Sequence, residues 1–410
     1  MGITARGAWE SVKRHFREIG RDIQNEDFTA VGVGDMSGDV FGNGMLLSKH
    51  TKLVGAFNHL HIFVDPNPDP AASHAERQRL FALPRSTWAD YDAKLISKGG
   101  GVFERKAKSI EVSAAMKAAF HLDKDEVTPN ELIRAMLLSP IDLLWFGGIG
   151  TYIKASRESH ADADDRSNDA VRVDGRDLRC KVVGEGANLA LTQLGRVEYA
   201  RRGGRLNTDF IDNSAGVDTS DHEVNIKIVL NDAAAQGVIS VDERNRLLGA
   251  MTDDVAHLVL NDNYLQTQAI TVAQAKAADQ LDLQWQFMRT LERRRLLDRD
   301  IERLPNDEEM ADRLSDDEGL TRPEYAVLFA YSKLALYSDL LPTDVPDDSY
   351  LAGDLARYFP ELIRDKFADQ ISSHRLRREI VATYVTNSLV NRVGATFVHK
   401  LAEQTGELVT

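Results

Sequence analysis

Residues 29–44 read TAVGVGDMSGDVFGNG, and the expected fold follows from this stretch. An apolar run leads into a cluster of glycines, and a helical pattern follows from residue 45 to about residue 53. A second apolar run, at residues 61–64, ends at Asp65. A strand, a glycine turn, a helix, a second strand and an acid, in that order, are typical of a dinucleotide-binding βαβ unit.

The residue types in this stretch suit a dinucleotide physically. Glycines let the backbone approach a pyrophosphate, and the start of the next helix directs free N–H groups at it. The acid that ends the second apolar run, Asp65, can accept hydrogen bonds from a ribose diol and would repel a 2′-phosphate. The glycine spacing is one residue longer than usual, so the turn of another α/β protein remains an alternative. We expect the side chains of Asp35 and Asp39 to point away from the phosphates.

Length and composition limit the possible classes of protein. A chain of 410 residues exceeds what one hydrophobic core usually serves, so we expect two domains. The net charge of −14 argues against nucleic acid or an anionic membrane as a partner. Cys180 is the single cysteine, which fits a reducing, cytoplasmic compartment. No apolar run reaches the roughly 18–20 residues that a transmembrane helix needs.

Three later apolar runs, at residues 142–146, 180–183 and 208–211, also end in turns rich in glycine, asparagine or serine. In an open parallel sheet such turns gather at the carboxyl edge, where ligands bind. The sequence therefore predicts an α/β Rossmann-like, doubly wound parallel sheet over residues 1–230. Residues 231–410 show helical patterns only, and we expect them to form an all-α domain.

Several motifs resemble one known family. GITARGAWESVKRHFRE, VGVGDMSGDVFGNGMLLS, DLLWFGGIGTY, VDGRDLRCKVVGEGANL and NTDFIDNSAGVDTSDHEVNIKI are similar to the C-terminal catalytic region of the very large bacterial NAD-specific glutamate dehydrogenases. The resemblance covers the whole chain and is strongest up to about residue 230. It implies oxidation of L-glutamate with NAD⁺ and water to 2-oxoglutarate, ammonia and NADH, and a homo-oligomer for the full-length protein.

The resemblance also implies roles for individual residues. Thr4 matches a threonine that faces the nicotinamide carboxamide, and Ser220 matches a serine that binds the substrate carboxylate. The implied cofactor-binding residues are Thr4, Gly34, Ser37, Gly38, Asp65, Gly147, Gly148, Asn188 and Asn213.

Ordinary structural roles compete with these assignments. Thr4 could cap a helix expected over residues 8–19, and Ser220 could cap a helix beginning near residue 223. Asn188 could be a turn residue with no ligand. The triplet DHE at residues 221–223 has no second cluster at ligand spacing, so we expect no metal site.

We expect no catalytic residue in this chain. The family uses lysines and a carboxylate on a substrate domain that precedes the TARG motif, and none of the lysines here lies in such a motif. The chain is therefore interpreted as a fragment that binds NAD and is inactive alone. Two alternatives remain open: a non-catalytic NAD-binding or oligomerisation module, and a dehydrogenase of another amino acid.

Overall fold

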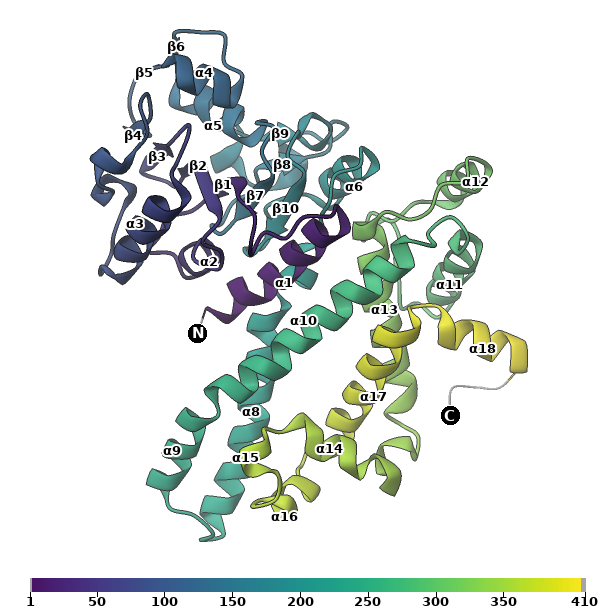
Figure 1. The fold of residues 1–410 in the computed structure, drawn as a ribbon. Coiled ribbons are helices and arrows are strands. Elements are labelled where there is room, and N and C mark those ends of the chain that lie inside the picture. Colours follow the sequence, from purple (N-terminus) through teal and green to yellow (C-terminus); the bar gives the residue numbers. More distant parts are fainter. Residues whose placement is uncertain (1, 407–410) are drawn as a thin grey trace. The chain divides into compact units, whose positions relative to one another are not determined.

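The computed structural model describes residues 2–406 and divides the chain into two compact units, Met1–Ser214 and Ala215–Thr410 (Figure 1). The first unit is mixed α/β, and the second is helical throughout its described part. The predicted boundary at residue 230 falls inside a helix of the second unit. Each unit is described separately below.

The first unit is built on a six-stranded sheet with the strand order β10-β7-β1-β2-β3-β4. The strands β1, β2, β7 and β10 are parallel, whereas β3 and β4 are antiparallel to their neighbours. The sheet is thus rich in parallel strands but not wholly parallel. The bounds of the strands are β1 Phe28–Val33, β2 Thr51–Phe57, β3 His61–Val64, β4 Gly101–Glu104, β7 Leu143–Phe146 and β10 Val182–Glu185.

The second strand of the expected βαβ unit was assigned to the wrong segment. Helix α2 covers only Asp39–Gly44, and residues 51–57, partly expected to be helical, form the parallel strand β2. The chain then turns at residues 58–60, and β3 returns antiparallel with Val64 opposite Gly55. The apolar run at residues 61–64 is a strand, as expected, but it runs in the opposite direction.

Helices cover both faces of the sheet. Helix α1, Ile3–Glu18, begins five residues before the expected start and buries Ala5, Trp9, Val12 and Phe16 along one face. It packs against α2 and β10. Helix α5, Pro129–Leu137, begins with the expected capping box between Thr128 and Glu131. The other helices of this unit are α3 Pro70–Ala82, α4 Ala114–Phe120, α6 Gln193–Arg201 and α7 Asp209–Asp212.

The run TDFI at residues 208–211, expected to be a strand, forms the helical turn α7 instead. Four residues are too few for apolar spacing to separate a strand from one turn of helix. The expected helix at residues 87–98 is replaced by two short 3₁₀ turns, Trp88–Asp90 and Ala93–Leu95. Four short strands complete the unit: β5 Ile110–Glu111, β6 Glu126–Val127, β8 Ile153–Lys154 and β9 Val173–Asp174.

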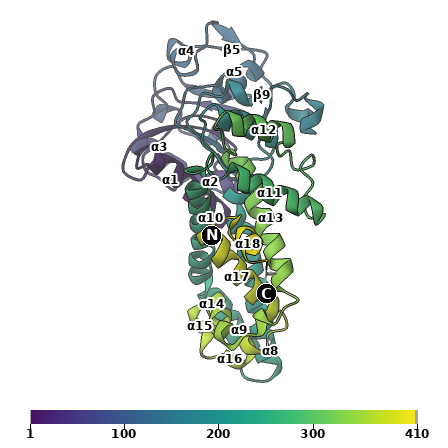
Figure 2. The same cartoon turned by 90° about the vertical axis from the view of Figure 1, so that its right-hand side faces the viewer.

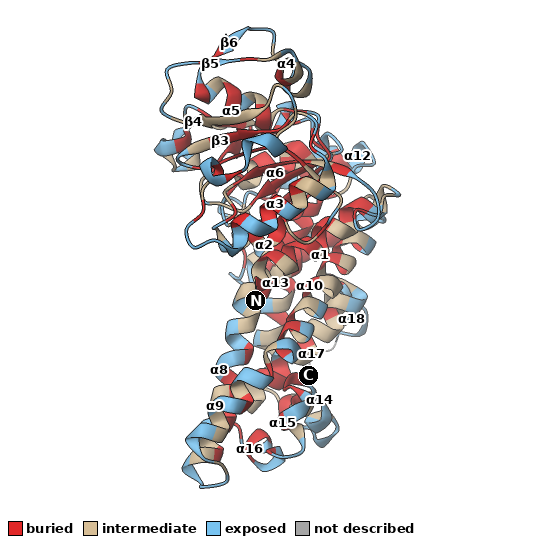
Figure 3. Ribbon diagram, turned by 60° about the vertical axis from the view of Figure 1, so that its left-hand side comes forward, coloured by how far each residue is buried: buried red, intermediate tan, exposed pale blue. Residues whose placement is uncertain are grey.

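Two hydrophobic clusters, one on each side of the sheet, hold this unit together. One contains Val31, Leu144 and Met136, and the other contains Ala30, Trp145 and Trp9. Neighbouring residues of a strand point to opposite faces, so β1 and β7 contribute to both clusters. Figure 3 shows that the parallel strands are almost entirely buried, as expected for strands covered on both faces.

The helical unit contains no strand within its described residues, as the sequence pattern predicted. Helices α10, α13 and α17 pack against one another, and α13 and α17 lie side by side in Figures 1 and 2. Among the described residues, no helix is long and apolar enough to cross a membrane. The helices are α8 Ser214–Ala235, α9 Val241–Ala250, α10 Thr252–Gln274, α11 Leu281–Arg293, α12 Asp307–Ser315, α13 Arg322–Leu340, α14 Ala352–Tyr358, α15 Glu361–Arg364, α16 Ala368–Ser372, α17 Arg377–Val393 and α18 Phe397–Thr405.

Candidate functional site

Three strand-end turns meet at one edge of the sheet. Strand β7 lies between β1 and β10, and all three are parallel, so the turns that follow them share the carboxyl edge. The turns after β1 and β7 are in contact, because a Cβ on Gly148 would lie 3.4 Å from the Cα of Gly34. The structure therefore brings Gly34, Gly147 and Gly148 together, as the sequence predicted.

The backbone geometry requires glycine at two of these positions. Gly34 has a φ of +135°, and a Cβ there would lie 2.8 Å from the Phe41 side chain. A Cβ on Gly147 would lie 2.6 Å from the Cα of Phe41. Trp88 donates a hydrogen bond of 2.9 Å from its indole Nε1 to the carbonyl oxygen of Gly34. Close packing alone thus accounts for these two glycines, whatever else they contact.

Asp35 does not point away from the glycine turn, contrary to expectation. Its Oδ1 accepts hydrogen bonds from the backbone N–H groups of Ser37 and Gly38, at 3.0 and 3.1 Å, and from the Ser37 hydroxyl at 2.6 Å. Its Oδ2 accepts a hydrogen bond of 2.7 Å from Asn58 Nδ2. The N–H groups that were expected to face phosphates are therefore already bound to a carboxylate. The other acid, Asp39, accepts a hydrogen bond from Asn43 on its own helix.

Asp65 lies at the opposite edge of the sheet from Gly34, because β3 runs antiparallel to β2. Its side chain is fully buried, and its Oδ1 accepts hydrogen bonds from the backbone N–H and the hydroxyl of Ser97, at 3.1 and 2.5 Å. This placement contradicts the predicted ribose contact. The residue that follows the second parallel strand at the carboxyl edge is Asn58.

The third turn carries the two predicted asparagines. Asn213 Nδ2 donates a hydrogen bond to Asn188 Oδ1, which joins the turn after β10 to the end of α7. Asp209 supports this turn, because its Oδ2 accepts a hydrogen bond of 2.8 Å from the backbone N–H of Leu189. Asn188 is exposed, and Asn213 is half-buried. The side-chain amides thus form a linked pair at the same edge as the glycine turns.

A buried ionic network lies directly under this turn, and no motif in the sequence indicated it. The guanidinium of Arg196 donates two hydrogen bonds of 2.8 Å to the carboxylate of Glu185, and it lies 3.2 Å from Asp209. Asp212 accepts hydrogen bonds from the backbone N–H of Glu185 and from Asn207 Nδ2. Burial raises the pKa of Glu185 to about 7, against the opposing charge of Arg196. The network fixes the end of β10 from which the Asn188 turn leaves.

Neither Thr4 nor Ser220 caps a helix. Gly2 is the N-cap of α1, and Thr4 lies half-buried in the first turn of that helix. Helix α8 begins at Ser214, so Ser220 lies inside it. Ser220 is exposed, between Val217 and Val224 on the same exposed side of the helix. Both capping alternatives are therefore wrong.

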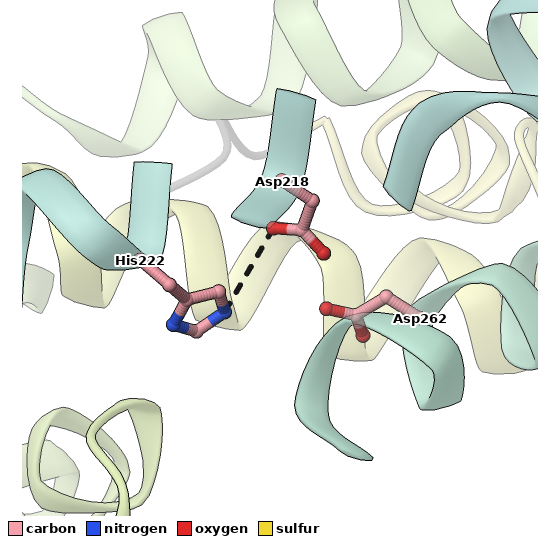
Figure 4. A group of neighbouring side chains, drawn as sticks. All are labelled: Asp218, His222 and Asp262. Atoms are coloured by element: carbon pink, nitrogen blue, oxygen red, sulfur yellow. Dashed lines mark ion pairs between the residues drawn. The ribbon is translucent and has the colours of Figure 1, made fainter. Parts of the chain in front are cut away.

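Helix α8 also carries titratable residues on its inner side. Asp218 and His222 approach Asp262 of α10 (Figure 4). In the sequence, only residues 221–223 suggested metal ligands, so Asp218 and Asp262 were not recognised as potential ligands. Asp218 precedes His222 by one helical turn, a spacing that places both on one face, whereas Asp262 comes from a distant segment.

Comparisons with known proteins agree with the resemblance seen in the sequence. The family model of the bacterial NAD-glutamate dehydrogenase catalytic domain matches residues 1–273, and the model of the glutamate dehydrogenase C-terminal region matches residues 317–410. The NAD-specific glutamate dehydrogenase of Pseudomonas aeruginosa is 58% identical over 406 residues, and that of Mycobacterium tuberculosis is 54% identical over 412 residues. Each alignment covers 99% of this chain but only 25% of the relative, so the chain spans about a quarter of their length.

Among solved structures, glutamate dehydrogenase 2 of Plasmodium falciparum aligns with a TM-score of 0.36 and 13% identity, over 67% of this chain and 46% of that one. This likeness is too low to bear on the arrangement of the strands. The match to the catalytic-domain family covers more than half of the sequence. The chain therefore belongs to the bacterial NAD-glutamate dehydrogenase family.

Proposed function

We propose that this chain provides the NAD-binding part of an NAD-specific glutamate dehydrogenase, which converts L-glutamate, NAD⁺ and water to 2-oxoglutarate, ammonia and NADH. The observation that supports it best is the meeting of three glycine- and asparagine-rich turns at the carboxyl edge of β1, β7 and β10. Ligands of open α/β sheets bind at this edge. The four parallel strands would then act as a Rossmann-like core, to which β3 and β4 add an antiparallel extension.

The residues at this edge fit a nicotinamide dinucleotide. The backbone N–H of Gly148 has no hydrogen-bond acceptor among the described residues, so it is available to a polar group of the cofactor. The linked amides of Asn188 and Asn213 offer donors and acceptors suited to ribose hydroxyls. Thr4 and Gly147 would complete this contact surface. The bound cofactor supplies the hydride acceptor, and the protein supplies binding and orientation.

We assign the discrimination between NAD and NADP to Asp35 instead of Asp65. The acid that selects NAD acts at the end of the second parallel strand, which is the position of Asn58. Asn58 holds the carboxylate of Asp35 at that end through the hydrogen bond of 2.7 Å. A carboxylate there would accept hydrogen bonds from a ribose diol and repel a 2′-phosphate. Ser37 and Gly38 would contact the pyrophosphate only after the Asp35 carboxylate gives up its hydrogen bonds to their N–H groups.

The cofactor assignment is tested by titrating NADH and NADPH fluorescence against the wild type and Asp35→Asn. We expect the ratio of NADPH affinity to NADH affinity to rise at least about tenfold, since one repulsive charge is removed. Asp39→Asn is the matched control, because Asp39 is an exposed acid on the adjoining helix. An unchanged ratio in Asp35→Asn would remove Asp35 from the ribose site.

The substrate side of the proposal rests on Ser220. Its hydroxyl is exposed on α8, where it bonds only weakly to the Gly216 carbonyl oxygen at 3.3 Å, so it can turn to a substrate carboxylate. The resemblance implies that the catalytic lysines and the proton-shuttling carboxylate belong to a substrate domain that precedes the TARG motif in the family. We expect the 410 residues, tested by themselves, to bind NADH, and glutamate-dependent reduction of NAD⁺ to require that domain.

Two assays on the purified chain separate the possible outcomes. Binding of NADH without glutamate-dependent reduction of NAD⁺ is the expected result. Robust turnover would refute the need for a separate substrate domain. Absence of NADH binding would refute the cofactor role itself. A homo-oligomeric, cytoplasmic full-length enzyme is part of the same proposal, and the single buried cysteine is compatible with a reducing compartment.

A further inference from the structure

A group of three potential metal ligands lies inside the helical unit, on residues with no role in the proposed cofactor site. Asp218 and His222 come from α8, and Asp262 comes from α10. One ligand atom of each residue lies within 4.8 Å of the other two. Figure 4 shows the three side chains converging, with the imidazole directed at the carboxylate of Asp218.

The imidazole of His222 is buried, and its Nδ1 neither accepts nor donates a hydrogen bond within the described part of the chain. The residue is 4% exposed. Its Nε2 lies 3.8 Å from Asp218 Oδ1, which is beyond hydrogen-bond distance. Buried polar groups in folded proteins are nearly always satisfied. The nitrogen without a partner is thus Nδ1, whereas Nε2 is the nitrogen that faces the acids and that could bind an ion placed between the two carboxylates.

Packing and hydrogen bonds hold this ring in place. His222 stacks on Tyr358, with ring centroids 4.2 Å apart. The Tyr358 hydroxyl donates a hydrogen bond of 2.7 Å to Asp221 and accepts one of 2.9 Å from Asn225. The aromatic ring against which the imidazole lies is therefore fixed at its far end. A ligand side chain held in this way loses little conformational freedom when it binds.

A cavity of about 340 Å³ adjoins the cluster, and Asp218, His222 and Asp262 are part of its wall. The remaining wall is largely polar and includes Asn261 and Ser388, together with Arg357, Arg364 and Arg392. A polar cavity of this size has room for several water molecules. Water could thus reach an ion at the cluster and complete its coordination.

We propose that Asp218, His222 and Asp262 bind one divalent transition-metal ion, with water from the adjoining cavity as the remaining ligands. Imidazole nitrogen together with carboxylate oxygen suits Zn²⁺, Mn²⁺ or Co²⁺ better than Ca²⁺ or Mg²⁺, which prefer oxygen alone. Ligands at bond lengths of about 2.1 Å lie roughly 3–3.5 Å apart. The three side chains would therefore close by about 1 Å around the ion.

Lys333 of α13 is the competing cation at this cluster. Its ammonium interacts electrostatically with both Asp218 and Asp262, and it lies 4.7 Å from the centre of the Phe329 ring. Without a metal ion, this ammonium is the positive charge that acts on both acids. Replacing it with a neutral side chain removes a competitor of the metal ion without removing a ligand.

The test uses the untagged 410-residue chain, stripped of metal with a chelator. Co²⁺ is titrated while its visible absorption is recorded, and Zn²⁺ binding is measured by calorimetry. We expect one equivalent to bind, and Asp218→Asn, Asp262→Asn and His222→Gln each to weaken binding at least about tenfold. Asp262→Glu should keep measurable binding, and Lys333→Met should bind more tightly than the wild type.

The matched controls are Asp254→Asn and His257→Gln, which remove the same residue types from exposed positions of α10. They should bind as the wild type does. The proposal fails if neither the wild type nor Lys333→Met shows saturable binding with a dissociation constant below about 1 mM, which corresponds to a binding free energy of roughly −4 kcal/mol. It also fails if the ligand variants, shown to be folded by circular dichroism, bind as tightly as the controls. Either result would mean that Asp218, His222 and Asp262 form an ionic cluster with Lys333 and bind no metal ion.

Discussion

Replacing Arg196 with methionine should cost the α/β unit much of its stability, because it leaves the carboxylate of Glu185 buried without its partner. Glu185 is fully buried and Arg196 is 5% exposed, and two hydrogen bonds of 2.8 Å join them. Removing one member of a buried ion pair typically costs about 3–5 kcal/mol. Asp209 and Asp212 keep other donors, whereas the Glu185 carboxylate loses both.

Protonation of Glu185 makes the stability of the variant depend on pH. In the variant, Glu185 can avoid a buried charge by taking up a proton, against an unfolded-state pKa near 4.5. At 1.36 kcal/mol per pH unit, this uptake costs about 3.4 kcal/mol at pH 7 and about 1.4 kcal/mol at pH 5.5. The folded-state pKa of Glu185 is raised, so the stability linked to it is present below pH 4.5 and is lost as the pH rises. Between pH 5.5 and pH 7 the variant should therefore lose about 2 kcal/mol of stability, whereas the wild type, in which the folded-state pKa is about 7, should lose about 1.6 kcal/mol.

Urea unfolding followed by tryptophan fluorescence measures this loss. Three of the four tryptophans, Trp9, Trp88 and Trp145, lie in the α/β unit and report on it. Arg176→Met is the matched control, because the Arg176 side chain is 55% exposed and its ion pairs are 3.9 Å long. It should change the free energy of unfolding by less than about 0.5 kcal/mol.

The double variant Glu185→Gln, Arg196→Met should recover part of the stability, because the Glu185 charge is removed and Asp209 keeps its hydrogen bonds from the backbone N–H groups of Leu189 and Phe210. Equal losses in Arg196→Met and Arg176→Met would refute the reasoning. So would a double variant that is no more stable than Arg196→Met, or an Arg196→Met variant whose free energy of unfolding does not fall as the pH rises from 5.5 to 7.

Three further changes test other parts of the fold. Gly147→Ala should lower the free energy of unfolding by about 1–3 kcal/mol, because its Cβ would lie 2.6 Å from the Phe41 backbone. In the control Gly203→Ala the new Cβ meets no atom within 4 Å, so the loss should be only about 1 kcal/mol of backbone strain. Urea unfolding compares the two variants. Cys180 should resist thiol reagents at pH 8 in the native protein, because burial raises its pKa to about 12. Rapid labelling of the native protein would contradict this prediction. Labelling of the protein unfolded in urea is the positive control. Thr128→Ala should lower the free energy of unfolding by about 0.5–2 kcal/mol, because helix α5 loses its N-cap. The midpoint of urea unfolding measures this loss, and an unchanged midpoint would show that the cap contributes nothing.

Elements defined by local chemistry could be predicted from the sequence. Helix α5 begins where Thr128, Pro129 and Glu131 predicted it, because a cap depends only on neighbouring residues. The direction of β3 could not be predicted in this way, because the apolar run at residues 61–64 pairs equally well in either direction. Its direction follows from the short turn at residues 58–60, in which Asn58 Oδ1 accepts hydrogen bonds from the backbone N–H groups of Leu60 and His61.

The same distinction applies to the site. Gly34, Gly147 and Asn188 could be placed at one edge of the sheet because each follows a parallel strand, and their contact with a cofactor stays a prediction. Asp65 was misplaced together with its strand. Arg196 and Asp262 could not be anticipated, because a charged side chain in a helix normally faces water and nothing in the spacing marks it as buried. Only the tertiary contacts of the helices reveal them.

The bond between Asp35 and the glycine turn has a consequence for the way the turn meets an anion. The N–H groups of Ser37 and Gly38 are satisfied by a carboxylate that belongs to the same loop. An incoming phosphate must therefore exchange with an acceptor that is tethered beside the site and is always present at high effective concentration. Such a tethered competitor lowers the apparent affinity for every anion at that position, and it keeps the turn in its folded shape between one occupant and the next.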